Sequence, residues 1–145
     1  MRFPAKTLLA CLTLGAGIAF AAEATDPTVK ARQQLMDTIA MNTKVLGDMA
    51  GGKAAFDAAA ADAAKTALAA AAADIATAFE PQASDPKSTA KPDIWANWDD
   101  YTKKAEALAT AAAALDPASV EGVQAGMAAI GGACKDCHST YRAPS

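Results

Sequence analysis

The chain has 145 residues, of which 52% are hydrophobic and 20% are charged, and its formal net charge is −3 at pH 7. This length predicts one domain, and the balance of apolar and charged residues is that of a globular protein rather than a disordered chain. Proteins that bind nucleic acid neutralise its phosphates with a basic surface, so the acidic net charge excludes that class. We therefore expect one globular domain with no nucleic-acid partner.

Residues 1–21 have the pattern of a secretory signal peptide. Arg2 and Lys6 supply a short positive region, an apolar run follows, and small residues form a cleavage site after Ala21. A membrane-spanning helix needs about 20 apolar residues, so this run is short for an anchor. A retained anchor and a lipoprotein signal at Cys11 are the alternatives. We predict cleavage and export, with no membrane attachment after cleavage.

Prolines and glycines divide the remaining domain, residues 22–145, into four helical stretches. The first and the last open on an Asp-Pro pair, which is an N-cap residue followed by proline at the first helical position. Apolar residues recur at three- and four-residue intervals within each stretch. Residues 80–92 hold three prolines and predict a loop. The expected helices run from Asp26-Pro27 to Gly51, from Asp57 to Pro81, from Asp93 to Leu115, and from Asp116-Pro117 to Tyr141.

Four helices of this length, joined mainly by short turns, pack most simply as an antiparallel bundle. The sequence therefore predicts an all-α fold, an up-down-up-down four-helix bundle.

The motif that carries chemistry is the stretch 134–138, which has the C-x-x-C-H spacing of covalent haem attachment. In that motif two thiols form thioethers with the haem, and the adjacent histidine supplies an axial nitrogen to the iron. On a helix, positions three and four residues apart share a face, so Cys134, Cys137 and His138 project from one side. A flat cofactor can lie against that side. We predict one covalently attached haem c.

Other uses of a cysteine pair fit less well. A structural zinc site needs two more thiolates or imidazoles, and the domain after the signal peptide has no other cysteine or histidine. A thiol-exchange pair sits at a helix N-terminus, where the dipole lowers the thiol pKa, whereas this pair lies near a helix C-terminus. A disulfide would be strained and would close a very short loop. A plain disulfide stays as the alternative to haem.

The helix pairing also suggests a second axial ligand. If the first and fourth helices pack antiparallel about their midpoints, the turn 134–138 faces residues 30–34, and Met36 is about one turn away. The other methionines of the domain point away or lie too far along the bundle: Met41, Met49 and Met127. Met36 is the candidate axial ligand. The alternative is that its flexible side chain only fills the core.

Arg32 lies one turn before Met36 on the same face of the first helix. A side chain that is always charged is unusual there unless an anion meets it. A haem propionate would fit, through a charge-assisted hydrogen bond. The alternative is that Arg32 reaches solvent at the rim of the bundle.

The signal peptide and three further stretches together resemble the cytochrome c-prime family of four-helix class II c-type cytochromes: ARQQLMDTIAMNTKVLG on the first helix, KPDIW opening the third, and GGACKDCHSTYR near the C-terminus. The resemblance implies a periplasmic bacterial haem protein, often dimeric, with the haem between the helices. In one branch of the family the iron is five-coordinate and binds nitric oxide or carbon monoxide. In the other, low-spin branch, a methionine of the first helix coordinates the iron, and Met36 occupies that position.

The expected function is therefore that of a periplasmic electron carrier with His138 and Met36 as axial ligands. The alternative is a five-coordinate protein that binds small gases at the distal haem face. Redox proteins are the expected partners, and a homodimer stays open. The carboxylates are scattered as N-caps and solvated charges, so we do not expect an enzyme.

Overall fold

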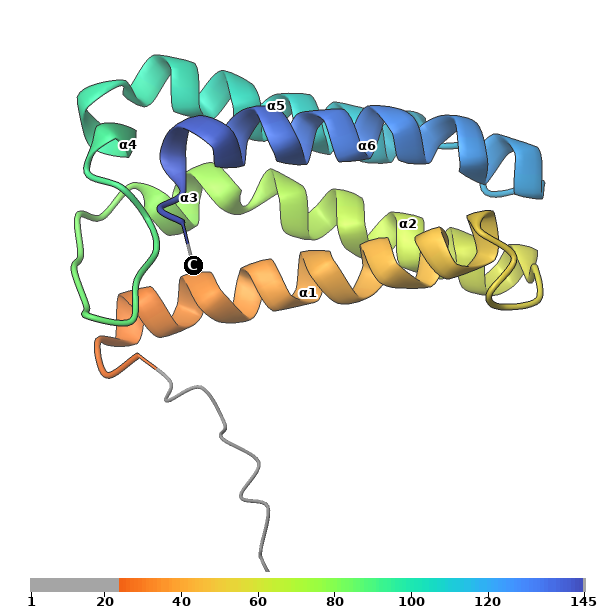
Figure 1. The fold of residues 1–145 in the computed structure, drawn as a ribbon, viewed down its shortest axis with the longest axis horizontal. Coiled ribbons are helices and arrows are strands. Elements are labelled where there is room, and N and C mark those ends of the chain that lie inside the picture. Colours follow the sequence, from red (N-terminus) through yellow and green to blue (C-terminus); the bar gives the residue numbers. More distant parts are fainter. Residues whose placement is uncertain (1–23, 145) are drawn as a thin grey trace, which may run out of the picture.

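The computed structural model describes residues 24–144, so the predicted signal peptide and Cys11 lie outside the described residues. Four long helices form an antiparallel bundle, in which α1 and α5 each pack against both α2 and α6 (Figure 1). The predicted four-helix bundle is confirmed. Within residues 24–144, none of the helices has the length and apolar character needed to cross a membrane. The helices are α1 (Pro27–Ala50), α2 (Ala58–Ala73), α3 (Ile75–Phe79), α4 (Asp93–Ala96), α5 (Trp98–Ala114) and α6 (Val120–Tyr141).

The ends of α1 are those that the sequence predicts. The Asp26 side chain accepts hydrogen bonds from the backbone N–H groups of Thr28 and Val29 at 2.8 and 2.9 Å, which caps the helix. After the helix, Gly52 has a φ of +69°, a left-handed conformation that glycine adopts without strain. Local side-chain and backbone preferences therefore favour both ends of α1.

Two of the four predicted helices contain a break, so each is two helices. Between α2 and α3, the Asp74 N–H bonds to the Ala71 carbonyl at 3.3 Å, three residues back, which tightens the last turn of α2. Between α4 and α5, Asn97 leaves the helical region, and its side-chain amide donates to the Asp93 carbonyl at 3.1 Å. The Asn97 backbone N–H donates to the same carbonyl at 3.0 Å, so α4 ends at this residue. The prediction of unbroken helices there is wrong.

The fourth helix starts later than predicted, because its cap is Ser119 rather than Asp116. The Ser119 hydroxyl accepts from the Gly122 N–H at 3.0 Å, while the Asp116 side chain accepts from the Ala118 N–H in the preceding turn. This turn folds back tightly on α6, since a Cβ at Gly122 would lie 2.7 Å from the Asp116 carbonyl oxygen. The second Asp-Pro pair therefore builds a turn and not a helix start.

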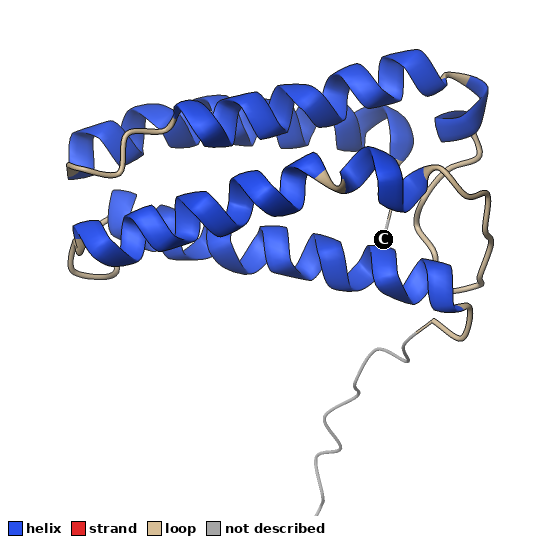
Figure 2. Ribbon diagram, turned by 180° about the vertical axis from the view of Figure 1, so that it is seen from behind, coloured by secondary structure: helices blue, strands red, loops and turns tan. Residues whose placement is uncertain are grey.

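Residues 80–92 form the predicted loop (Figure 2). One buried carboxylate anchors this loop to the start of α1. Asp85 is 8% exposed and accepts hydrogen bonds from the backbone N–H groups of Thr25 and Asp26 at 2.8 and 3.0 Å. Its second oxygen accepts from the Lys87 N–H at 2.8 Å. The loop is thus held against the end of the bundle where α1 begins.

We predict that acid loosens this end of the bundle through Asp85. Hydrogen bonds from the backbone of Asp26 and Lys87 lower the pKa of Asp85 to about 2. An unfolded chain has an aspartate pKa of about 3.9, so the carboxylate contributes its full stability above about pH 4 and loses it as the pH falls towards 2. Thermal unfolding across this window should show a smaller loss of Tm in Asp85→Asn than in the wild type.

The exposed Asp62 supplies the matched control, Asp62→Asn, because its carboxylate makes no hydrogen bond or ion pair with any residue from Ala24 to Pro144. This variant should lose Tm with acid as the wild type does. Equal acid sensitivity of Asp85→Asn and the wild type would show that Asp85 does not anchor the loop.

Candidate haem site

A cavity of about 670 Å³ lies between the helices, at the end of the bundle where α1 begins and α6 ends. This volume falls in the range of cofactor pockets. Its walls come from α1, α5 and α6, with α3 and the loop 80–92 closing the end. The cavity is lined by all five site residues that the sequence predicts: Arg32, Met36, Cys134, Cys137 and His138.

The packing of α1 on α6 sets which residues are level across this cavity. A Cβ at Gly47 would lie 3.6 Å from the Met127 Cε, so these two positions are side by side. The helices are antiparallel, and eleven residues further along α6 is His138, while eleven residues back along α1 is Met36. The register therefore places Met36 and His138 at the same level of the bundle.

The methionines of α1 differ in whether they face the cavity, as predicted. Met36 is half-buried and packs against the core. Met41 points outward and is 61% exposed, whereas Met49 is buried towards the other end of α1. Among the described methionines, only Met36 lines the cavity. A second sulfur ligand to a group held by His138 would have to come from this residue.

Both cysteines of the described chain are half-buried free thiols on the last turns of α6. Burial raises the pKa of both thiols, and that of Cys137 to about 11. Thiol exchange requires a lowered pKa, so the environment does not suit a redox-exchange pair. No cluster of three or more His, Cys, Asp or Glu side chains able to hold a metal ion occurs in residues 24–144.

His138 lies beside the cysteines in the last turn of α6, at the mouth of the cavity. Desolvation lowers its pKa, and the positive charge of Arg142 lowers it further. The neutral imidazole, which is the form that binds metals, is therefore favoured at pH 7.

Arg32 is 3% exposed, so the alternative that it reaches solvent is wrong. Its Nε donates to the Ala78 carbonyl at 2.9 Å, and its two terminal nitrogens donate to the carbonyls of Pro81 and Ala83. The guanidinium carbon also lies 4.8 Å from the centre of the Phe79 ring. Arg32 thus ties the chain after α3 to α1. Three of its five N–H groups are used, and the propionate contact stays a prediction.

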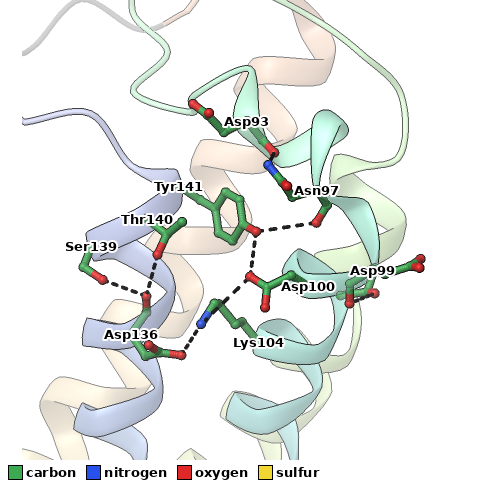
Figure 3. A network of polar contacts seen from close by, with 10 residues as sticks. Asp93, Asn97, Asp99, Asp100, Lys104, Asp136, Ser139, Thr140 and Tyr141 are labelled. Atoms are coloured by element: carbon green, nitrogen blue, oxygen red, sulfur yellow. Dashed lines mark hydrogen bonds and ion pairs between the residues drawn. The ribbon is translucent and has the colours of Figure 1, made fainter.

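A polar network holds α6 against α5 beside the cysteines (Figure 3). The hydroxyl of the buried Tyr141 donates to the Asp100 carboxylate at 2.7 Å. Lys104 pairs with Asp136 of α6 and lies 4.0 Å from Asp100, one turn before it on α5. These contacts fix the rotation of the turns that carry the haem motif.

Sequence reasoning missed two hydroxyl groups of the cavity. Tyr101 is 2% exposed and lies three residues after Trp98 and four before Ala105, so the apolar spacing of α5 could have identified it. Thr43 lies two turns after Met36 on the same face of α1. Its hydroxyl is buried and has no hydrogen-bond partner among the described residues.

The donor set of the cavity fits a covalently attached haem. Two thiols and an imidazole share one face of α6, a thioether lies level with them on α1, and much of the lining is apolar. The buried Thr43 hydroxyl is an orphaned polar atom, which is expected where a cavity receives a group from outside the chain.

The family model described as "Cytochrome C'" matches residues 27–142. The chain belongs to the cytochrome c′ family. It is 36% identical over 143 residues to cytochrome c-556 of Agrobacterium fabrum, a match that covers 94% of each chain. It is also 34% identical over 144 residues to cytochrome c′ of Cereibacter sphaeroides, which covers 94% of this chain and 97% of that relative.

Solved cytochrome c′ structures have the same fold. A Rhodobacter cytochrome c′ superposes with a TM-score of 0.74 at 34% identity, over 81% of this chain and 96% of that one. The nitric oxide complex of a mutant cytochrome c prime from Alcaligenes xylosoxidans gives a TM-score of 0.73 at 26% identity, over 81% of this chain and 94% of that one. As a cytochrome c′ family protein, the chain carries covalent haem c, which confirms the cofactor prediction.

In this cytochrome c′ family protein, Arg32 should be essential for stability. Arg32→Gln leaves the buried carbonyls after α3 without their charged donor, and we expect a loss of about 3 kcal/mol in the free energy of unfolding. Urea unfolding of the haem-loaded protein, followed by circular dichroism, measures it. Lys53→Gln removes the same charge from an exposed turn and is the control. A loss no larger than that of the control would contradict the role given to Arg32.

Proposed function

We propose that this protein is a periplasmic c-type cytochrome that carries single electrons between redox proteins. Cys134 and Cys137 attach the haem, and His138 and Met36 ligate its iron. The observation that carries the proposal is the placement of Met36, which lines the cavity at the level of His138. The pattern of a signal peptide at residues 1–21 supports export.

A haem bound here supplies a one-electron iron couple, and ligation by an imidazole and a thioether favours the ferrous state. The chain's own residues provide the setting. Buried apolar side chains such as Val29 and Leu108 line the cavity and keep water out. His138 is exposed at the end of α6, with the exposed Lys135 beside it. This edge of the site is where a redox partner can approach.

Catalysis of a reaction on a substrate is not part of the proposal. Three carboxylates have structural roles. Asp26 caps α1, and Asp85 and Asp100 accept hydrogen bonds that hold the fold together. Cytochrome c′ family proteins are haem carriers, which agrees with this assignment.

Gas binding is the second candidate function, because the structure of one relative is a nitric oxide complex. In that case Met36 would pack in the cavity without ligating, and the face of the haem towards α1 would accept nitric oxide or carbon monoxide. The two functions differ at one side chain.

We predict that replacing Met36 by leucine converts one behaviour into the other. The wild type should be low-spin and unreactive towards carbon monoxide, since both axial positions are taken. Met36→Leu keeps an apolar side chain of similar volume but removes the sulfur, so its haem should become high-spin and bind carbon monoxide. Absorption spectra of the oxidised and reduced proteins, with and without carbon monoxide, measure both properties.

Met41→Leu is the matched control, because Met41 lies on the same helix but is 61% exposed. This variant should behave as the wild type does. A wild type that is high-spin and binds carbon monoxide, with no further change in Met36→Leu, would overturn the ligand assignment and favour gas binding.

The attachment of the haem is tested separately. Cys134→Ala and Cys137→Ala each leave one thiol, so we expect poor maturation, and the double variant should retain no haem after denaturing electrophoresis and haem staining. The third cysteine provides the control, since Cys11 lies in the predicted signal peptide and Cys11→Ala should stain as the wild type does. Full staining of the double variant would refute attachment at α6.

A further inference from the structure

The ring of Tyr101 is held rigidly by aromatic neighbours from three helices. Phe79 of α3 lies 5.5 Å from it, Trp98 of α5 stacks at 5.6 Å, and Tyr141 of α6 meets it edge-on at 5.3 Å, all between ring centres. Such pairs stabilise one orientation of the ring. Tyr101 is 2% exposed and lines the cavity, so the position of its hydroxyl is fixed by packing.

The two tyrosines of this cluster differ in how their hydroxyls are satisfied. Tyr141 donates to the Asp100 carboxylate at 2.7 Å. The Tyr101 hydroxyl makes no hydrogen bond to any residue between Ala24 and Pro144. Because Tyr101 lines the cavity, this hydroxyl is left to donate to whatever the cavity holds. Its placement is therefore consistent with an acceptor that is not part of the chain.

The charges around this hydroxyl indicate what kind of acceptor it meets. The Arg32 guanidinium lies 4.8 Å from the centre of the Phe79 ring, which itself packs on Tyr101, and both Arg32 and Tyr101 line the cavity. Burial raises the pKa of Tyr101, so it stays a neutral donor. Arg32 keeps two N–H groups beyond the three that it donates to backbone carbonyls. A neutral donor beside a guanidinium suits an anion with more than one acceptor oxygen.

Haem c offers few groups of that kind. Its ring nitrogens bind iron, its thioether sulfurs are weak acceptors, and its two carboxylates are the strong ones. We propose that the Tyr101 hydroxyl donates a hydrogen bond to a carboxylate of the bound haem, beside Arg32. This contact would fix the in-plane orientation of the haem and withdraw negative charge from it. The inference rests on the haem site proposed above, but it does not require Met36 to ligate the iron.

The haem-loaded variants Tyr101→Phe and Tyr141→Phe test the proposal, since each removes one hydroxyl from the same aromatic cluster. The carboxylate bending vibration in the resonance Raman spectrum stiffens when the carboxylate accepts hydrogen bonds. It should fall in frequency in Tyr101→Phe and stay unchanged in Tyr141→Phe. The midpoint potential should also fall in Tyr101→Phe, because a carboxylate without its donor stabilises ferric iron.

An unchanged carboxylate band in Tyr101→Phe, or an equal change in both variants, would overturn the proposal. Loss of Met36 ligation would instead alter the spin state and leave this vibration in place, so the two failures are distinguishable. If Tyr101→Phe does not retain haem, Tyr141→Phe protein grown with fluorinated tyrosine answers the question, because Tyr101 is then the only tyrosine. The more acidic phenol should raise the band frequency, and no change would overturn the proposal.

Discussion

The antiparallel contact between α1 and α6 determines which side chains share the cavity. Gly47 and Met127 lie side by side in this contact, which shows the register of the two helices. With that register, Met36 is level with His138. A shift of one residue along a helix rotates a side chain by about 100°, so Met36 would then leave the cavity wall. The candidate ligand pair therefore depends on helix packing far from the haem motif itself.

The structure also shows which features a sequence can predict. The start of α1 depends on Asp26 and the next three residues, and the haem motif is a fixed local spacing, so both could be found. The late start of α6 depends on whether Asp116 or Ser119 caps the helix, and the break before α5 depends on Asn97 leaving the helical region. These are near-equal local choices that packing decides. The carbonyl partners of Arg32 lie 46 or more residues away, and no local pattern contains them.

The two cavity tyrosines show how the same residue type acquires different roles from its surroundings. Tyr141 has its acceptor within the chain, so its hydrogen bond contributes to the packing of α6 on α5. The ring of Tyr101 lies 5.3 Å from that of Tyr141, but its hydroxyl has no acceptor among the described residues. Its hydroxyl is therefore available to a group that the cavity binds, as proposed above.

Whether the protein transfers electrons or binds gases depends on one atom, the sulfur of Met36, in a fold that serves both functions. This protein and the relative seen with nitric oxide superpose over most of their length, so the bundle is compatible with either chemistry. Function must then be argued from the site. Arg32, the cysteines and His138 would serve a gas-binding protein equally well. Only a sulfur at position 36 favours electron transfer, because it can occupy the place that a gas would need.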